Sequence, residues 1–230
     1  MDGTTEACGR ALVRSGIYSL LARALSGPDG ALDRKGLEDL LGLLEEDGPY
    51  ASLAPRARAA VEAVGTLASD PRSVAKEYTG LFQKGNAPPY EGSYLSSFRA
   101  TQELADVGGF FRAFGTQVRG ERPDHLVSEL ELMSLLCLKE ALARGNGQAE
   151  AADICRDAEA KFLRDHLGRW VPAYADQLRA QARLPIFPIL VDLVEGVVGR
   201  DAESLHVAPE RIQEVAPPDG DEPPRCGVAR

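Results

Sequence analysis

Apolar residues recur three and four positions apart along most of the chain, and no sustained alternation of apolar and polar residues accompanies them. This spacing gathers apolar side chains on one stripe of a helix, whereas a half-buried strand needs a period of two. Of the 230 residues, 44% are hydrophobic, which is enough to bury a substantial core. The pattern therefore predicts an all-α protein, a single globular domain of about nine to ten helices.

The expected helices lie near residues 5–25, 32–46, 55–68, 71–83, 95–114, 123–143, 148–168, 171–181 and 186–199. They define a helical domain over residues 1–200, and the connector "GTQVRGERP" at 115–123 is where two halves of this domain would hinge or exchange. Residues 201–230 are acidic and rich in proline, a composition typical of a mobile or surface-bound extension.

Charge and hydropathy exclude two classes of partner. The chain has 35 acidic and 26 basic residues, a net charge of −9, which disfavours binding to nucleic acid phosphates. The longest apolar run, residues 184–199, contains Asp192 and Glu195 and is shorter than the roughly 20 residues that span a bilayer. We therefore expect neither a nucleic acid partner nor stable membrane insertion.

The cysteines and the N-terminal segment bear on the cellular compartment. Cys8, Cys137, Cys155 and Cys226 show no C-x-x-C spacing, and two of them lie within helical patterns as small apolar residues. No secretory apolar segment is expected near the N-terminus, because arginines interrupt the apolar positions there. A reducing, cytoplasmic location fits best.

The stretch "RPDHLVSELELMSLLCLKE", residues 122–140, is apolar around most of its helical circumference yet begins with polar groups. In one interpretation these groups only start the helix: Asp124 complements the helix dipole and His125 bonds nearby backbone. In the other, Asp124, His125, Glu129 and Glu131 border a groove that receives a positively charged partner. The sequence leaves both interpretations open.

The loop "GNAPPYEGSY" cannot be helical, because two adjacent prolines force an extended backbone. Tyr90 and Tyr94 flank Glu91, so a carboxylate lies between two aromatic rings. An ion pair combined with a cation–π contact suits a guanidinium or ammonium group. The alternative is a rigid loop whose tyrosines pack on the core.

Signatures of catalysis are weak. His125 and Glu129 are four positions apart, but two ligands without a second cluster do not define a metal site, and no H-E-x-x-H motif is present. His166, at helical spacing from Phe162 and Trp170, is predicted to pack at a helix end. We expect no catalytic residue, no metal site and no resident cofactor.

Three stretches resemble, in order and spacing, the TorD/DmsD family of redox-enzyme maturation chaperones. They are "EYTGLFQKGNAPPYEGSYL" at 77–95, "RPDHLVSELELMSLLCLKE" at 122–140 and "FLRDHLGRWVPAYADQL" at 162–178. The third is most similar to the subgroup that serves type II molybdenum enzymes, such as those acting on dimethylsulfide, ethylbenzene, chlorate or selenate. Gly92 departs from the pattern, because members of the family commonly carry serine after the glutamate.

The resemblance implies a cytoplasmic, non-catalytic chaperone with the all-helical TorD-like fold. Its partners would be the catalytic subunit of a molybdopterin oxidoreductase and that subunit's twin-arginine signal peptide, bound before the molybdenum cofactor is inserted and the enzyme exported. An alternative is a structural delta subunit that stays in the mature complex, and an enzyme using His125 and Glu129 is a third.

The residues that the family motifs assign to the client are Tyr78, Leu81, Phe82, Pro89, Tyr90, Glu91, Pro123, Asp124, His125 and Glu129. The neighbouring Tyr94 and Glu131 complete the predicted client-binding set. Asp124 and Glu91 are the predicted partners of the leader's arginines.

Overall fold

The computed structural model describes residues 3–46, 48–118 and 120–212, and over this range the protein is an all-α single domain. Within the described residues no strand forms, and one isolated antiparallel bridge joins Tyr90 to His125. None of the described helices has the length and apolar character that crossing a membrane would require. The predicted fold class is confirmed.

The α-helices are α1 Gly3–Leu25, α2 Pro28–Ala31, α3 Arg34–Glu46, α4 Ala54–Leu67, α5 Pro71–Tyr78, α6 Ser97–Ala113, α7 Leu126–Gly145, α8 Ala149–Phe162, α9 Gly168–Gln181 and α10 Ile186–Ser204. Short 3₁₀ turns lie at η1 Ala51–Leu53 and η3 Glu91–Tyr94, and π turns at η2 Thr79–Gln83 and η4 Leu163–Leu167.

Several helix bounds differ from those expected. The helix predicted to begin at 123 begins at Leu126, because Pro123 and Asp124 form a turn and His125 is extended in its bridge with Tyr90. The break predicted between 168 and 171 is absent: the π turn η4 carries α8 directly into α9, which retains Pro172 in its interior. A helix ladder can therefore continue past a proline that the sequence presents as a boundary.

The first residues of the predicted tail, 201–204, belong to helix α10. Helix α10 runs to Ser204, and residues 205–212 fold back so that the Ile212 amide donates to the Arg169 carbonyl over 2.9 Å. The rest of the predicted tail, residues 213–230, lies outside the described residues, as does residue 119 in the predicted hinge. Both predictions therefore stay predictions.

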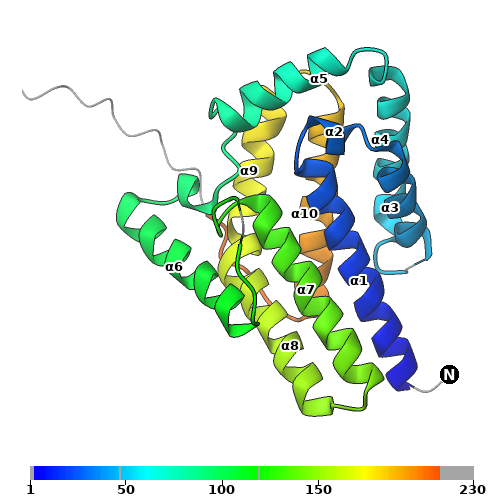
Figure 1. Cartoon of the computed structure of the whole chain (residues 1–230), viewed down its shortest axis with the longest axis vertical. Coiled ribbons are helices and arrows are strands. Elements are labelled where there is room, and N and C mark those ends of the chain that lie inside the picture. The colour runs from blue at the N-terminus through cyan, green and yellow to red at the C-terminus, as the bar shows by residue number, and fades with distance from the viewer. Residues whose placement is uncertain (1–2, 47, 119, 213–230) are drawn as a thin grey trace, which may run out of the picture.

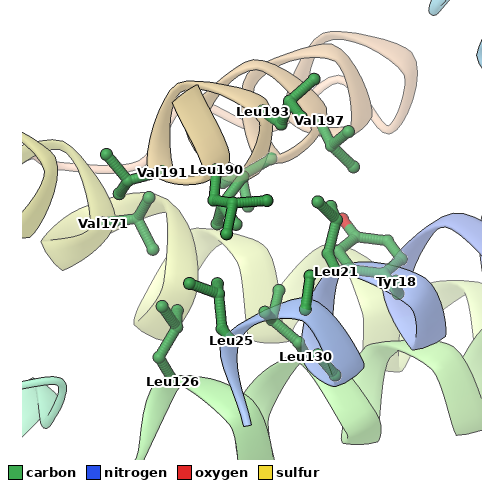
Figure 2. Packing of buried hydrophobic residues seen from close by; sticks show 14 of the residues in the cluster. Tyr18, Leu21, Leu25, Leu126, Leu130, Val171, Leu190, Val191, Leu193 and Val197 are labelled. Carbon is green, nitrogen blue, oxygen red and sulfur yellow. The ribbon is translucent and has the colours of Figure 1, made fainter. Parts of the chain in front are cut away.

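Helices α1 and α7 lie side by side at the centre of the bundle, with α9 and α10 packed behind them (Figure 1). Their shared core is apolar, and Figure 2 shows α1, α7, α9 and α10 meeting through Tyr18, Leu21, Leu25, Leu126, Leu130, Val171, Leu190 and Val191. Full burial of such an aliphatic side chain stabilises the fold by roughly 1.5–3 kcal/mol. The buried Cys137 and Cys155 pack as the small apolar residues that the sequence predicts.

A buried arginine joins the first helix, α1, to the last helix, α10. Arg14 of α1 donates to Asp201 of α10 from Nε over 3.0 Å and from Nη2 over 2.8 Å. Its Nη1 lies 2.7 Å from Glu159 and 3.4 Å from Glu140, so α7 and α8 join the same cluster. Burial raises the pKa of Glu159 to about 7, against the opposing charge of Arg14. Glu140 ends the stretch 122–140, but its partners come from distant parts of the chain, and this cluster was not predicted.

The core position of α7 gives a direct test of the packing. Leu130→Ala should lower the free energy of unfolding by about 2–5 kcal/mol, because a fully buried side chain leaves a cavity. Leu142→Ala on the same helix removes a side chain that is 56% exposed and should cost far less. Urea denaturation of both variants measures the difference, and equal losses would contradict the described packing of α7.

Candidate functional site

Two segments that the sequence singles out are joined by backbone hydrogen bonds at the start of α7. The Glu91 amide donates to the Asp124 carbonyl over 2.9 Å, and the Leu126 amide donates to the Pro89 carbonyl over 2.8 Å. Between these bonds lies the antiparallel bridge of Tyr90 with His125. The proline loop satisfies backbone groups at the helix entrance, and the two motifs form one structural unit.

Asp124 is fully buried and holds a guanidinium group of the same chain. Arg122 donates from Nε to Oδ1 over 2.9 Å and from Nη2 to Oδ2 over 2.7 Å, a bidentate ion pair. The carbon at the centre of the guanidinium lies 4.9 Å from the centre of the Tyr90 ring. The ion pair with cation–π contact that the loop predicts is present here, but its carboxylate is Asp124 and its cation is internal.

His125 caps helix α7. Its Nδ1 accepts a hydrogen bond from the Val127 amide over 3.1 Å, and its ring packs against Tyr90 with 5.0 Å between ring centres. Burial lowers the pKa of His125, which keeps this nitrogen free to accept. The helix-start interpretation is confirmed for His125, whereas Pro123 lies before the helix and not in its first turn.

Glu91 is buried and bonded to the third motif. Its Oε2 lies 3.0 Å from Nδ1 of His166, whose Nε2 lies 3.3 Å from Asp106 on α6. Burial raises the pKa of Glu91. Burial alone would lower the pKa of His166, but the hydrogen bond and negative charge of Glu91 outweigh it, so the His166 pKa is raised. His166 therefore links the loop to α6, and its pairing with Glu91 favours the charged form of the ring.

Glu129 lies on the same buried side of the site. Trp170 donates from Nε1 to Glu129 Oε2 over 3.0 Å, and Tyr94 packs against Trp170 with 5.7 Å between ring centres. Burial, and after it the charge of Glu91, raise the pKa of Glu129 well above its ordinary value. The acid thus favours its protonated form and serves to join α7 to α9.

The first motif belongs to the core. Tyr78 packs against Phe82 with 4.5 Å between ring centres, Phe82 packs against Phe187 of α10, and the Tyr78 hydroxyl donates to the Leu25 carbonyl. Leu81 is 2% exposed. These side chains hold α5 and η2 against α1 and α10.

The twelve predicted client-binding residues fall into three groups by exposure. The buried ones are Tyr78, Leu81, Phe82, Pro89, Glu91, Tyr94, Asp124 and Glu129. Tyr90, Pro123 and His125 are half-buried, and Glu131 is exposed. Both acids predicted to bind a leader arginine have partners within the chain: Asp124 pairs with Arg122, and Glu91 Oε2 bonds His166.

Sequence reasoning missed the partners of these acids. Arg122 stands two positions before Asp124 and was not singled out, and His166 was expected only to pack at a helix end. Glu103 and Asp106 of α6 belong to no motif. The pairing of Glu91 with His166 joins residues 75 positions apart and leaves no local pattern, whereas the R-x-D spacing at 122–124 was a usable signal.

In the described part of the chain, one group of three ligand-type side chains lies close enough for a metal ion: Glu91, Glu103 and His166, with candidate atoms within 4.8 Å of one another. His166 already bonds Glu91, and Arg169 donates to Glu103 over 3.1 Å. The pair predicted as a weak metal candidate, His125 and Glu129, is not in this group.

An apolar groove of about 390 Å³ adjoins this site between α6 and α8. Its lining residues recur three or four apart on each helix and include Phe110, Phe114, Ile154, Asp106, Asp157 and Lys161. Phe110 also packs against the His166 ring with 5.7 Å between ring centres. Helix α6 stands at the edge of the bundle (Figure 1). The groove is open to solvent.

The fold and site define an all-helical protein whose motif residues bond and pack against one another and whose open groove is mainly apolar, with two aspartates and one lysine in its lining. Residues 50–176 match the family model described as nitrate reductase delta subunit. The chain belongs to this family.

The chain is similar to three curated proteins named as chaperones. It is 35% identical over 111 residues to the chlorate reductase assembly chaperone protein of Ideonella dechloratans, covering 45% of this chain and 56% of that protein. It is 27% identical over 222 residues to the perchlorate reductase assembly chaperone protein of Dechloromonas aromatica, covering 89% and 95%. It is 26% identical over 198 residues to the chaperone protein TorD of Photobacterium profundum, covering 81% and 89%. These matches confirm the resemblance to TorD-type chaperones.

The raised pKa of His166 can be measured by NMR titration of its ring. In the wild type this pKa should lie above the ordinary 6.5, so the stability that protonated His166 contributes is present below pH 6.5 and is lost as pH rises through the raised value. Glu91→Gln should lower the His166 pKa, because burial then dominates. Asp106→Asn changes a partner that is 63% exposed and should lower it less. An unchanged His166 pKa in Glu91→Gln would contradict the described pairing.

Proposed function

We propose that this protein is a cytoplasmic, non-catalytic chaperone for the catalytic subunit of a molybdopterin oxidoreductase. It binds the subunit before the molybdenum cofactor is inserted and holds the twin-arginine leader until export. The similarity to proteins named as assembly chaperones supports this role, one of them matched over 95% of its length.

The observation that carries the leader-binding part of the proposal is the groove between α6 and α8. A twin-arginine leader combines a basic segment with an apolar one. The groove is lined by two acids, Asp106 and Asp157, against one base, Lys161. Its apolar wall includes Phe110, Phe114 and the 57% exposed Ile154. The net charge of −9 adds long-range attraction for a basic peptide.

A synthetic peptide of the client's twin-arginine leader tests the groove. Ile154→Asp should weaken binding by about tenfold or more, because it places a charge where apolar contact is expected. Leu142→Asp is the matched control, since Leu142 is 56% exposed but does not line the groove. Isothermal titration calorimetry measures both, and equal affinity in the two variants would exclude this groove as the site.

The second candidate function is a structural subunit that stays in the mature enzyme, as the family's delta-subunit name suggests. Purification of the active molybdenum enzyme distinguishes the two. A chaperone leaves the complex after assembly, whereas a subunit persists at a fixed stoichiometry.

Deletion of the gene tests the maturation role in the cell. We expect the catalytic subunit to be synthesised but to be poor in molybdenum, unstable or retained in the cytoplasm, and a wild-type copy supplied in trans should restore activity. Metal analysis and fractionation of the strain provide the measurements. Fully loaded, exported and active enzyme in the deletion strain would contradict the proposal.

A further inference from the structure

We propose that Tyr90 and Asp124 form a guanidinium-binding site which Arg122 closes from within the chain, and that an arginine of the client displaces Arg122 on binding. This inference rests on the proposed function. The two oxygens of one carboxylate accept from Nε and Nη2 along one edge of the guanidinium, and the guanidinium carbon lies over an aromatic ring; together these contacts fit arginine better than lysine.

The two partners of the ion pair differ in access to solvent. The Arg122 side chain is 51% exposed, whereas that of Asp124 is 1% exposed. The acid is further fixed by the Gly92 amide, which donates to its Oδ2 over 3.2 Å. A buried acid paired with a cation on the solvent side can exchange that cation without leaving its position.

Only the Arg122 side chain has to move. The backbone carbonyl of Arg122 accepts from the Ser128 hydroxyl over 3.0 Å and from the His125 amide over 3.2 Å. These bonds hold the main chain at the entrance of α7. Rotation of a half-exposed side chain into solvent is fast and leaves the helix cap intact.

Gly92 leaves room for the closed pair of Arg122 and Asp124. A Cβ atom at this position would lie 3.0 Å from Asp124 Oδ2, 3.3 Å from Ala100 Cβ and 3.5 Å from Arg122 Nη2. A larger residue would therefore crowd the carboxylate and the bound guanidinium. The glycine, which departs from the serine common in the family, allows Asp124 and Arg122 to meet closely.

The internal arginine sets a condition on the client. Because Arg122 is tethered beside Asp124, its effective concentration is high, and a lone arginine in solution competes poorly. A leader whose apolar segment is already bound presents its arginine at a comparable effective concentration. The closed pair would thus select partners that combine arginine with apolar contact and reject basic peptides without it.

The test measures binding of N-acetylarginine amide, which carries a guanidinium but no client sequence. Arg122→Ala should bind this probe about tenfold more tightly than the wild type, because no internal competitor remains. Arg164→Ala is the matched control: Arg164 is 50% exposed and pairs with Asp165, which is 42% exposed and not buried. Arg164→Ala should bind the probe as the wild type does.

Arg122→Gln serves as a second opened variant that keeps a polar side chain, and far-UV circular dichroism checks that each variant is folded. Adding Asp124→Asn to either opened variant should abolish the gain. If folded Arg122→Ala and Arg122→Gln bind the probe no more tightly than the wild type, the proposal is overturned. The same result follows if the gain survives Asp124→Asn.

The leader peptide separates this inference from the proposed function. Tighter probe binding by the opened variants, with no leader binding by any form, would support the guanidinium site and reject the leader-binding role. Leader binding that is equal in wild type and Arg122→Ala, and sensitive to Ile154→Asp, would retain the chaperone role and overturn displacement of Arg122.

Discussion

The burial of α7 on nearly all sides is the constraint on which the rest of the structure depends. A polar group in such a helix costs free energy unless it finds a partner inside the protein. Glu129 accepts a hydrogen bond from Trp170 of α9. Glu140 forms an ion pair with Arg14 of α1, which also pairs with Asp201 of α10. The polar residues of α7 therefore determine which helices surround it, in addition to the apolar packing that holds them there.

The need for internal partners also explains the polar residues of the family motifs. Their sequence suggests a binding site, yet most of these residues are buried. Glu91 is bonded to His166, and His166 in turn reaches Asp106 on α6. Helix α6 forms one wall of the open groove, so the buried polar residues position the surface that we propose binds the leader. Replacement of a buried motif residue can thus impair client binding without any direct contact.

The helical periodicity was sufficient to predict the all-α fold and most helices, because each of these features is local. His125 as a helix cap was also within reach, since a cap is recognised by its place before an apolar run. The internal partners were not, because Arg14 bonds Asp201 across 187 positions and Glu91 bonds His166 across 75. Side-chain type alone shows that an acid at such a position needs a partner, but only the packing of helices identifies it.

The exposed apolar surface is where the proposed client would make contact. Among the described residues, the exposed large apolar side chains are Leu12, Phe98, Leu138, Leu142 and Ile154. A groove of about 390 Å³, mainly apolar and lined by two aspartates and one lysine, has the character that the proposed leader peptide requires. When a client arginine leaves, the Arg122 side chain can pair with Asp124 again. Release of the client would therefore not leave Asp124 unpaired in the core.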